Sequence, residues 1–233
     1  HMPGTHWLHP HHHGSSSIHL AGGAALALIV KDQPGSLPQE VADAEERVLV
    51  FQDWDIHTAQ EISRKAGDAA FASSLGMIEG GDDVGQRFIT VNGMYQPTMT
   101  VVPGIWARWR IVYAGWQDLP LNLMTETNEA GCEFQLLAKD GIYVSDYPRK
   151  LTGAIPVPPG GRADIMVRCI DVGSTKLSAL SRDTLTIVSR KGEGAIDLEG
   201  DVVGLGEEPA KDLRNSTATA TVGAQLSELT PWQ

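Results

Sequence analysis

Short apolar segments separated by turns run through most of this 233-residue chain. Several of them end at Asn-Gly, Pro-Gly or Asp-Gly pairs, at 92–93, 103–104 and 140–141. Asn-Gly is typical of the two-residue turn of a β-hairpin, because both positions need a positive φ. Many short strands with frequent turns cannot bury their apolar faces unless they pack as a sandwich or barrel. We therefore predict an all-β fold.

One of these segments alternates in character along its length. In 106–113, Trp106, Arg108 and Arg110 alternate with smaller or more apolar residues, a pattern that predicts a half-buried strand. We expect Arg108 and Arg110 to lie on the polar face of an edge or surface strand and not to bind a substrate. Trp106 and Trp109 are expected to serve packing. The other expected strands lie at 26–30, 48–51, 88–91, 98–102, 133–138, 155–157, 163–169 and 184–188.

The histidines are concentrated at the start of the chain, where seven of the eight fall within the first nineteen residues. Imidazole is the commonest protein ligand for metals such as copper and zinc. In an extended strand, His9 and His11 project to the same side, and Pro10 between them prevents a helix. Trp7 shares that side, whereas His11 and His13 form a second such pair. Spacing alone leaves open which pair binds a metal.

Three other interpretations of the histidine-rich segment compete with metal binding. It resembles the scar of a purification tag, but Trp7, Leu8 and Pro10 interrupt the histidines and an apolar segment follows directly. A solvated loop without a ligand role is the second alternative. A buried core histidine explains one of the seven at most.

Residues 4–11 read GTHWLHPH, and ALIV follows at 27–30. This resembles the second copper motif of multicopper oxidases, the family of laccases and ascorbate oxidase, with Leu8 in place of the usual Tyr. The downstream ALIV segment favours His9 and His11, which in the family ligate the paired type 3 coppers of a trinuclear cluster. Whether His13 or His6 also binds metal stays open.

A second stretch resembles the middle cupredoxin domain of the same family. VNGMYQP at 91–97, PGIWARWRI at 103–111 and PPGGRADIMV at 158–167 match that domain's turns and strands. The resemblance runs from about residue 3 to residue 188 and is weak between 55 and 85, where the composition suggests a helical insert. It implies a cupredoxin-like Greek-key β-sandwich, with a partial strand unit before it.

The family's type 1 copper site needs a cysteine flanked by histidines, and this chain lacks that motif. Neither Cys132 nor Cys169 has a histidine neighbour, and His57 is the only histidine beyond residue 19. We therefore interpret the chain as an internal fragment of such a protein. A disulfide between the two cysteines and two buried thiols remain equal alternatives.

The resemblance divides the chain into four parts. Residues 1–35 would be the C-terminal piece of a first cupredoxin domain with the copper-ligand motif. Residues 36–45 would be a connector, 46–191 the middle cupredoxin domain, and 192–233 a linker toward a missing third domain. The incomplete first domain would leave strand edges unpaired, so self-association of the fragment is expected.

The function that follows is that of a fragment of a copper-dependent oxidase. The whole protein would couple one-electron oxidation of a small reducing substrate to reduction of dioxygen to water, and this chain alone would be inactive. The alternative is a cupredoxin-like metal-binding or scaffold module without turnover. The net charge of −11 argues against nucleic acid and anionic membrane as partners, and no apolar run is long enough for a transmembrane helix. Only the resemblance suggests a secreted or periplasmic location.

Overall fold

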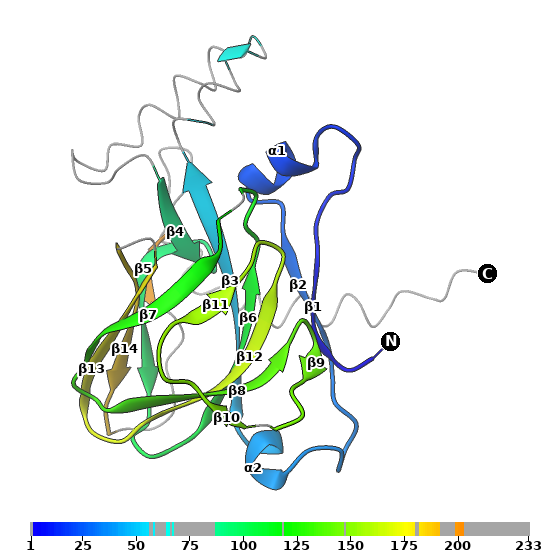
Figure 1. Ribbon diagram of the computed structural model, residues 1–233. Helices are drawn as coiled ribbons and strands as arrows, with labels where there is room; N and C mark the ends of the chain where they lie inside the picture. Colours follow the sequence, from blue (N-terminus) through cyan, green and yellow to red (C-terminus); the bar gives the residue numbers. More distant parts are fainter. Residues whose placement is uncertain are drawn as a thin grey trace. The chain divides into compact units, whose positions relative to one another are not determined.

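The chain is described here by a computed structural model (Figure 1). The structure describes residues 2–55, 58, 64–65, 67, 87–117, 119–146, 148–179, 182–191 and 199–202. All of them belong to one compact unit, His1–Val203. Almost all of the expected insert at 55–85 lies outside the described residues. None of the helices in the described part of the chain is long and apolar enough to cross a membrane.

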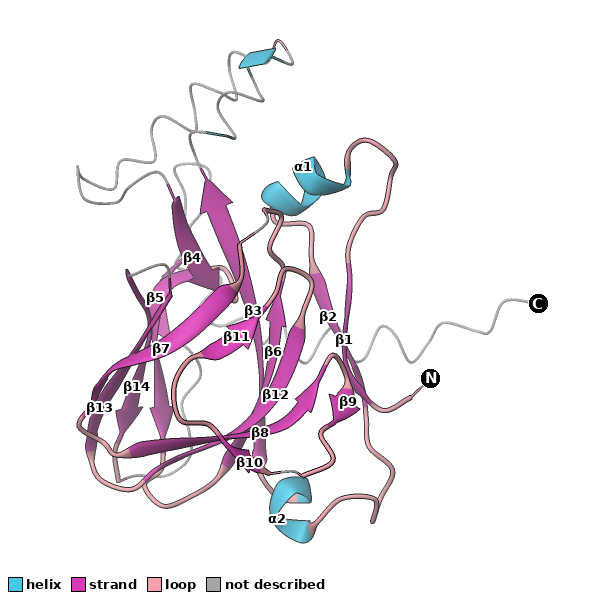
Figure 2. Cartoon of the chain, viewed as in Figure 1, coloured by secondary structure: helices cyan, strands magenta, loops and turns pink. Residues whose placement is uncertain are grey.

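Strands dominate the described residues, and the two helices are short (Figure 2). The helices are α1 (Ser16–Ala21) and α2 (Gln39–Ala42). The strands are β1 (Gly4–Leu8), β2 (Leu26–Val30), β3 (Glu45–Asp55), β4 (Arg87–Val91), β5 (Met94–Val101), β6 (Ala107–Tyr113), β7 (Leu121–Asn128), β8 (Cys132–Lys139), β9 (Ile142–Tyr143), β10 (Arg149–Lys150), β11 (Ile155–Val157), β12 (Arg162–Cys169), β13 (Gly173–Ala179), β14 (Arg182–Ser189) and β15 (Glu199–Val202).

The strands form two sheets of very different size. β1 and β2 pair only with each other, antiparallel, and we call these two strands the ribbon. The larger sheet follows the order β10-β8-β12-β6-β3-β4-β5-β14-β13-β7-β11, with β9 beside β8 and β15 beside β5. β3 runs parallel to β6, and β14 runs parallel to β5. The larger sheet curls, so that strands from its two halves face each other in Figure 1.

One hydrophobic core joins the two halves of the curled sheet. Phe51 of β3, Trp109 of β6 and Ile165 of β12 belong to the same buried cluster as Leu123 of β7 and Ile187 of β14. Each of these five side chains is at most 1% exposed. This packing of two sheet faces around one core confirms the all-β, cupredoxin-like fold that we predicted.

The predicted hairpin turns are confirmed by their backbone geometry. Asn92 and Gly93 have φ angles of 51° and 79° and join β4 to β5. Asp140 and Gly141 have φ angles of 51° and 80° and join β8 to β9. Positive φ at both central residues is what a type I′ turn requires. β7 and β13 were not predicted, because exposed or small polar residues interrupt their apolar pattern.

Candidate metal centre

The two candidate ligands lie in the segment that leaves the ribbon, immediately after β1 ends at Leu8. The ring of Trp7 stacks on that of His9, with 4.3 Å between ring centroids and 21° between planes. The His9 and His11 rings follow at a centroid distance of 5.8 Å. The rings of residues 7, 9 and 11 are therefore neighbours in space, in the same order as in the sequence. His9 is half-buried, whereas His11 is exposed.

A backbone contact determines which nitrogen of His9 is free. Its Nδ1 lies 3.0 Å from the carbonyl oxygen of Pro10, and a carbonyl can only accept a hydrogen bond. Nδ1 must therefore carry the proton, which leaves the lone pair on Nε2. Metal-ligating histidines commonly use such a second hydrogen bond to fix their tautomer and ring orientation. His9 is thus suited to bind a metal through Nε2.

The other described histidines of this segment have different surroundings. Nε2 of His6 donates to the carbonyl of Met2 at 3.1 Å, and Nδ1 of His12 lies 3.2 Å from the hydroxyl of Ser15. His13 and His19 are exposed. Within the part of the chain that the structure describes, no three side chains of His, Cys, Asp or Glu converge into a metal-binding group. His9 and His11 therefore offer a metal two imidazoles, fewer than the four ligands of a closed site.

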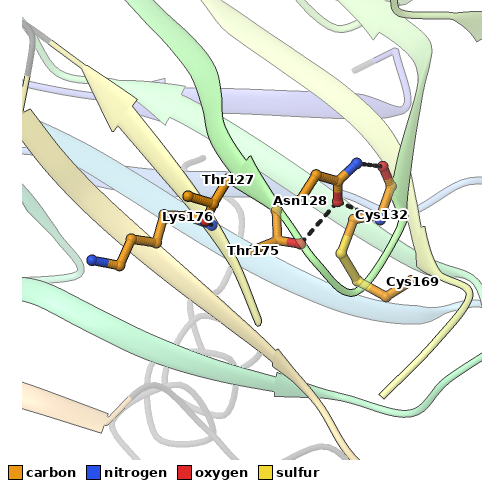
Figure 3. Close-up of a disulfide and its surroundings, with 6 residues drawn as sticks. All are labelled: Thr127, Asn128, Cys132, Cys169, Thr175 and Lys176. Carbon is orange, nitrogen blue, oxygen red and sulfur yellow. Dashed lines mark hydrogen bonds between the residues drawn. A yellow bond between two sulfur atoms is a disulfide. The ribbon is translucent and has the colours of Figure 1, made fainter. Parts of the chain in front are cut away.

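The two cysteines form a disulfide, which decides between the alternatives that the sequence left open. Cys132 of β8 lies directly opposite Cys169 of β12 in the antiparallel register. Figure 3 shows Asn128 beside the disulfide, where its amide group exchanges two hydrogen bonds with the backbone of Cys132 and accepts one from Thr175. These are the chain's two cysteines, so no thiolate remains to bind copper.

Beneath the ribbon lies a buried cluster of Arg108, Arg110, Asp32 and Asp164, which we call the arginine cluster. Nη2 of Arg108 and Nη1 of Arg110 contact Oδ2 of Asp164 at 2.7 Å and 3.0 Å. Asp32 contacts Arg108 at 3.1 Å and Arg110 at 3.4 Å. The expectation that these arginines lie on an edge or surface strand is therefore wrong. β6 is central, every one of its residues is buried, and the ribbon contributes to covering the arginines.

The charges of the arginine cluster are reflected in its pKa values. Burial by itself raises the pKa of Asp32, but the hydrogen bond from Tyr143 and the charge of Arg108 outweigh it and hold this pKa below 3.8. Burial lowers the pKa of Arg108, yet the adjacent Asp164 carboxylate raises it above its ordinary value. Burial and the hydrogen bond to Asp32 raise the pKa of Tyr143 to about 12. Asp32 and Arg108 are thus charged at neutral pH, and Tyr143 is a neutral donor.

Sequence reasoning missed the arginine cluster, although it noted Arg108, Arg110 and the motif that contains Asp164. Thr5 and Asp164 are 159 residues apart and share a hydrogen bond. No local pattern predicts a contact across that separation. An aspartate two residues after an apolar strand, as at Asp32, was the one available indication of a polar contact.

Comparisons with known proteins support the fold. No protein-family model matches the sequence, and no curated protein matches it significantly. The structure is similar to a blue copper oxidase from Nitrosomonas europaea, with a TM-score of 0.57, 22% identity, and coverage of 81% of this chain and 57% of that one. It is also similar to a multi-copper oxidase from Pseudomonas thermotolerans, with a TM-score of 0.57, 24% identity, and coverage of 90% and 44%.

A copper nitrite reductase from Nitrosomonas europaea is similar as well, with a TM-score of 0.55, 14% identity, and coverage of 85% and 64%. The chain thus spans about half the length of the first two structures and somewhat more of the third. At these identities the likeness shows the cupredoxin-like fold. Two of these proteins are named as oxidases and the third as a nitrite reductase, so the fold alone does not identify a reaction.

Proposed function

We propose that this chain is part of a longer copper-dependent oxidase and supplies two imidazole ligands, His9 and His11, to its type 3 coppers. The observation that carries the proposal is the series of neighbouring Trp7, His9 and His11 rings, in which Trp7 stacks on His9 and His9 has Nε2 free. The likeness to copper oxidases adds support at the level of fold. Bound copper would supply one-electron redox chemistry, which suits oxidation of a small reducing substrate with dioxygen as acceptor.

The chemistry of the donors fits copper. Two neutral imidazoles stabilise both common oxidation states of the metal, and His9 is already oriented by its contact with Pro10. Trp7 covers one face of the His9 ring, which limits access of water to that face. Two ligands form an open site, so we expect modest affinity in the chain by itself.

A second candidate function is a metal-binding or scaffold module of the cupredoxin type that does not turn over a substrate. Two observations favour it for this chain taken alone. Both cysteines are joined in a disulfide, and the described residues hold no group of three or more metal-ligating side chains. The two candidates share the metal site and differ only in turnover.

A copper titration tests the shared site. Because the Trp7 ring lies 4.3 Å from that of His9, binding of Cu²⁺ at His9 should quench the fluorescence of Trp7, and Trp7→Phe identifies that part of the signal. His9→Ala and His11→Ala should weaken binding by about tenfold or more, given that loss of even an outer partner of a ligand costs 10–100-fold.

His12→Ala and His13→Ala are the matched controls, since both residues are exposed neighbours in the same segment. We expect each to change the affinity for Cu²⁺ little. Equal losses for His11→Ala and His12→Ala would show that the segment chelates copper without a defined pair of ligands, and that the proposal is wrong. Greater loss for His13→Ala than for His9→Ala would favour the His11–His13 pair.

A further inference from the structure

The arginine cluster contacts the ribbon through charged and polar atoms. The hydroxyl of Thr5, in β1, donates to Oδ1 of Asp164 at 2.5 Å and accepts from Nη1 of Arg110 at 3.1 Å. Asp32, two residues after β2 ends, receives hydrogen bonds from Arg108 and from the hydroxyl of Tyr143. Each strand of the ribbon is thus tied to the larger sheet at or near one of its ends.

The contacts of Thr5 are buried, and those of Asp32 are partly buried. Thr5 is fully buried, and the side chains of Arg108, Arg110 and Asp164 are 3%, 1% and 1% exposed. That of Asp32 is 11% exposed. Charges removed from water interact strongly, and the loss of one partner leaves another charge uncompensated. The contacts between ribbon and cluster are therefore sensitive to single substitutions.

The ribbon lies outside the hydrophobic core clusters. Neither of the two hydrophobic clusters contains a residue of β1 or β2. The backbone of Gly4 approaches Gly141 so closely that an added Cβ would lie 2.7 Å from the Gly141 carbonyl oxygen. Trp7 lies against Gly160, where an added Cβ would be 3.1 Å from the Trp7 ring. A two-stranded ribbon is marginally stable on its own, so its order depends on this docking.

One face of β1 leads from the arginine cluster toward the candidate ligands. Thr5 and Trp7 are alternate residues of β1 and share a face, and His9 and His11 continue the two-residue interval beyond the end of the strand. Thr5 reaches Asp164, Trp7 lies against Gly160, and His9 stacks on Trp7. Movement of Thr5 would therefore move the ligand pair.

We infer that the arginine cluster is a polar anchor that holds the ribbon on the larger sheet, and that Thr5 and Asp32 act through it as positioning residues for His9 and His11. The anchoring stands on the contacts described above. The positioning of metal ligands rests on the proposed function. The two parts are separated by measuring ribbon order and copper affinity on the same variants.

Hydrogen exchange of the ribbon amides at 4–8 and 26–30 tests the anchor. Thr5→Val removes the hydroxyl and leaves the ion pairs of Asp164 in place, and Asp32→Asn removes one charge next to β2. Each should speed exchange of the ribbon amides by about tenfold or more, because hydrogen bonds to charged groups are among the stronger ones. Exchange in β8 and β12 should change little.

Asp146→Asn is the matched control. Asp146 pairs with Arg149 on the surface, with side chains 58% and 52% exposed, so its loss should leave ribbon exchange unchanged. Ribbon amides that exchange at the wild-type rate in both Thr5→Val and Asp32→Asn would overturn the anchor. So would equal acceleration in β8 and β12, because the cluster would then stabilise the whole fold and not the ribbon in particular.

Copper affinity tests the positioning. Thr5→Val should weaken binding of Cu²⁺ severalfold and change the Cu²⁺ electron paramagnetic resonance spectrum, and Thr5→Ser, which keeps the hydroxyl, should restore both. Loosened ribbon amides with unchanged copper affinity and spectrum would contradict the positioning role and leave the anchor intact. Absence of copper binding at His9 and His11 in the wild-type chain would instead contradict the proposed function, and the exchange result would stand.

Discussion

Because Cys132 and Cys169 form a disulfide, neither residue can bind copper as a thiolate. Intense blue colour in a copper protein requires a cysteine thiolate bound to copper, together with histidines. Both sulfurs are committed to a disulfide on adjacent strands, Cys169 is fully buried, and Cys132 is 5% exposed.

We therefore predict that the copper-loaded chain shows no intense absorption band near the wavelength of a blue copper site. Visible absorption spectroscopy of the copper-loaded protein checks this, with the His9→Ala variant as a control for binding at the proposed site. An intense blue band in the unreduced protein would show that one of the cysteines ligates copper after all.

The carboxylate of Asp32 should make the stability of the fold depend on acid pH. The pKa of Asp32 in the folded state is lower than its unfolded value of 3.8. Between the folded-state pKa and pH 3.8, the unfolded chain therefore binds more protons than the folded one. The stabilisation by Asp32 is thus complete above pH 3.8 and is lost as the pH falls through the lower folded-state pKa. The pKa of Glu46, which pairs with Lys31 and Arg110, is lowered from 4.5 and acts in the same direction.

Asp32→Asn should lower the free energy of unfolding by about 1–3 kcal/mol at pH 7, as expected for lost hydrogen bonds to charged groups. The difference from the wild type should shrink as the pH falls below 3.8. Urea unfolding at a series of pH values measures it, and Asp146→Asn serves as the exposed control. Asp53 opposes this trend in both proteins, because burial raises its pKa in spite of its pairing with Arg87. A difference that persists undiminished at low pH would contradict the assignment to Asp32.

Among the elements, neither strand of the ribbon contributes a residue to the two hydrophobic clusters. Leu8 and Leu26 lie opposite each other in its register and are 50% and 42% exposed, and Ile18 of α1 is 50% exposed. Exposed strand ends with apolar side chains favour pairing with another chain.

We expect the chain to self-associate through the ribbon, to an extent that increases with concentration. Replacing Leu8 and Leu26 by Lys should shift the sedimentation-velocity distribution toward monomer. Met124→Lys is a suitable control, since Met124 is 52% exposed but lies on β7, which is paired on both sides. A wild-type chain that remains monomeric at all concentrations would show that the ribbon does not mediate self-association.

At the scale of the whole molecule, a pair of histidine ligands without a second site that accepts electrons from a substrate should not support turnover. Oxidation of a reducing substrate needs a site that accepts single electrons, and the thiolate for such a type 1 copper is absent from this chain. The fold by itself does not supply the activity, because similar structures carry different reactions.

The isolated chain loaded with copper should therefore not oxidise a phenolic dye above the rate of free Cu²⁺. Oxygen consumption and dye absorbance measured together check this, with the His9→Ala and His11→Ala variants as references for copper released into solution. Sustained turnover that depends on both histidines would contradict the fragment interpretation.

The sequence alone determined the features that depend on local chemistry. Asn92–Gly93 and Asp140–Gly141 form the predicted turns because few other residue pairs accept two positive φ angles. The strands from β3 to β14 that carry regular apolar patterns lie where those patterns predicted. The adjacency of the Trp7, His9 and His11 rings follows from the i, i+2 spacing, while their role as copper ligands stays a prediction.

Only the tertiary structure decided which distant residues meet. It brought Cys132 opposite Cys169, and it covered Arg108 and Arg110 with the ribbon, where alternation along β6 had suggested exposure. Both outcomes depend on strand order in the sheet and on what packs over each face. Strand order depends on how much apolar surface the whole chain buries, and this total cannot be read from the sequence of any single segment.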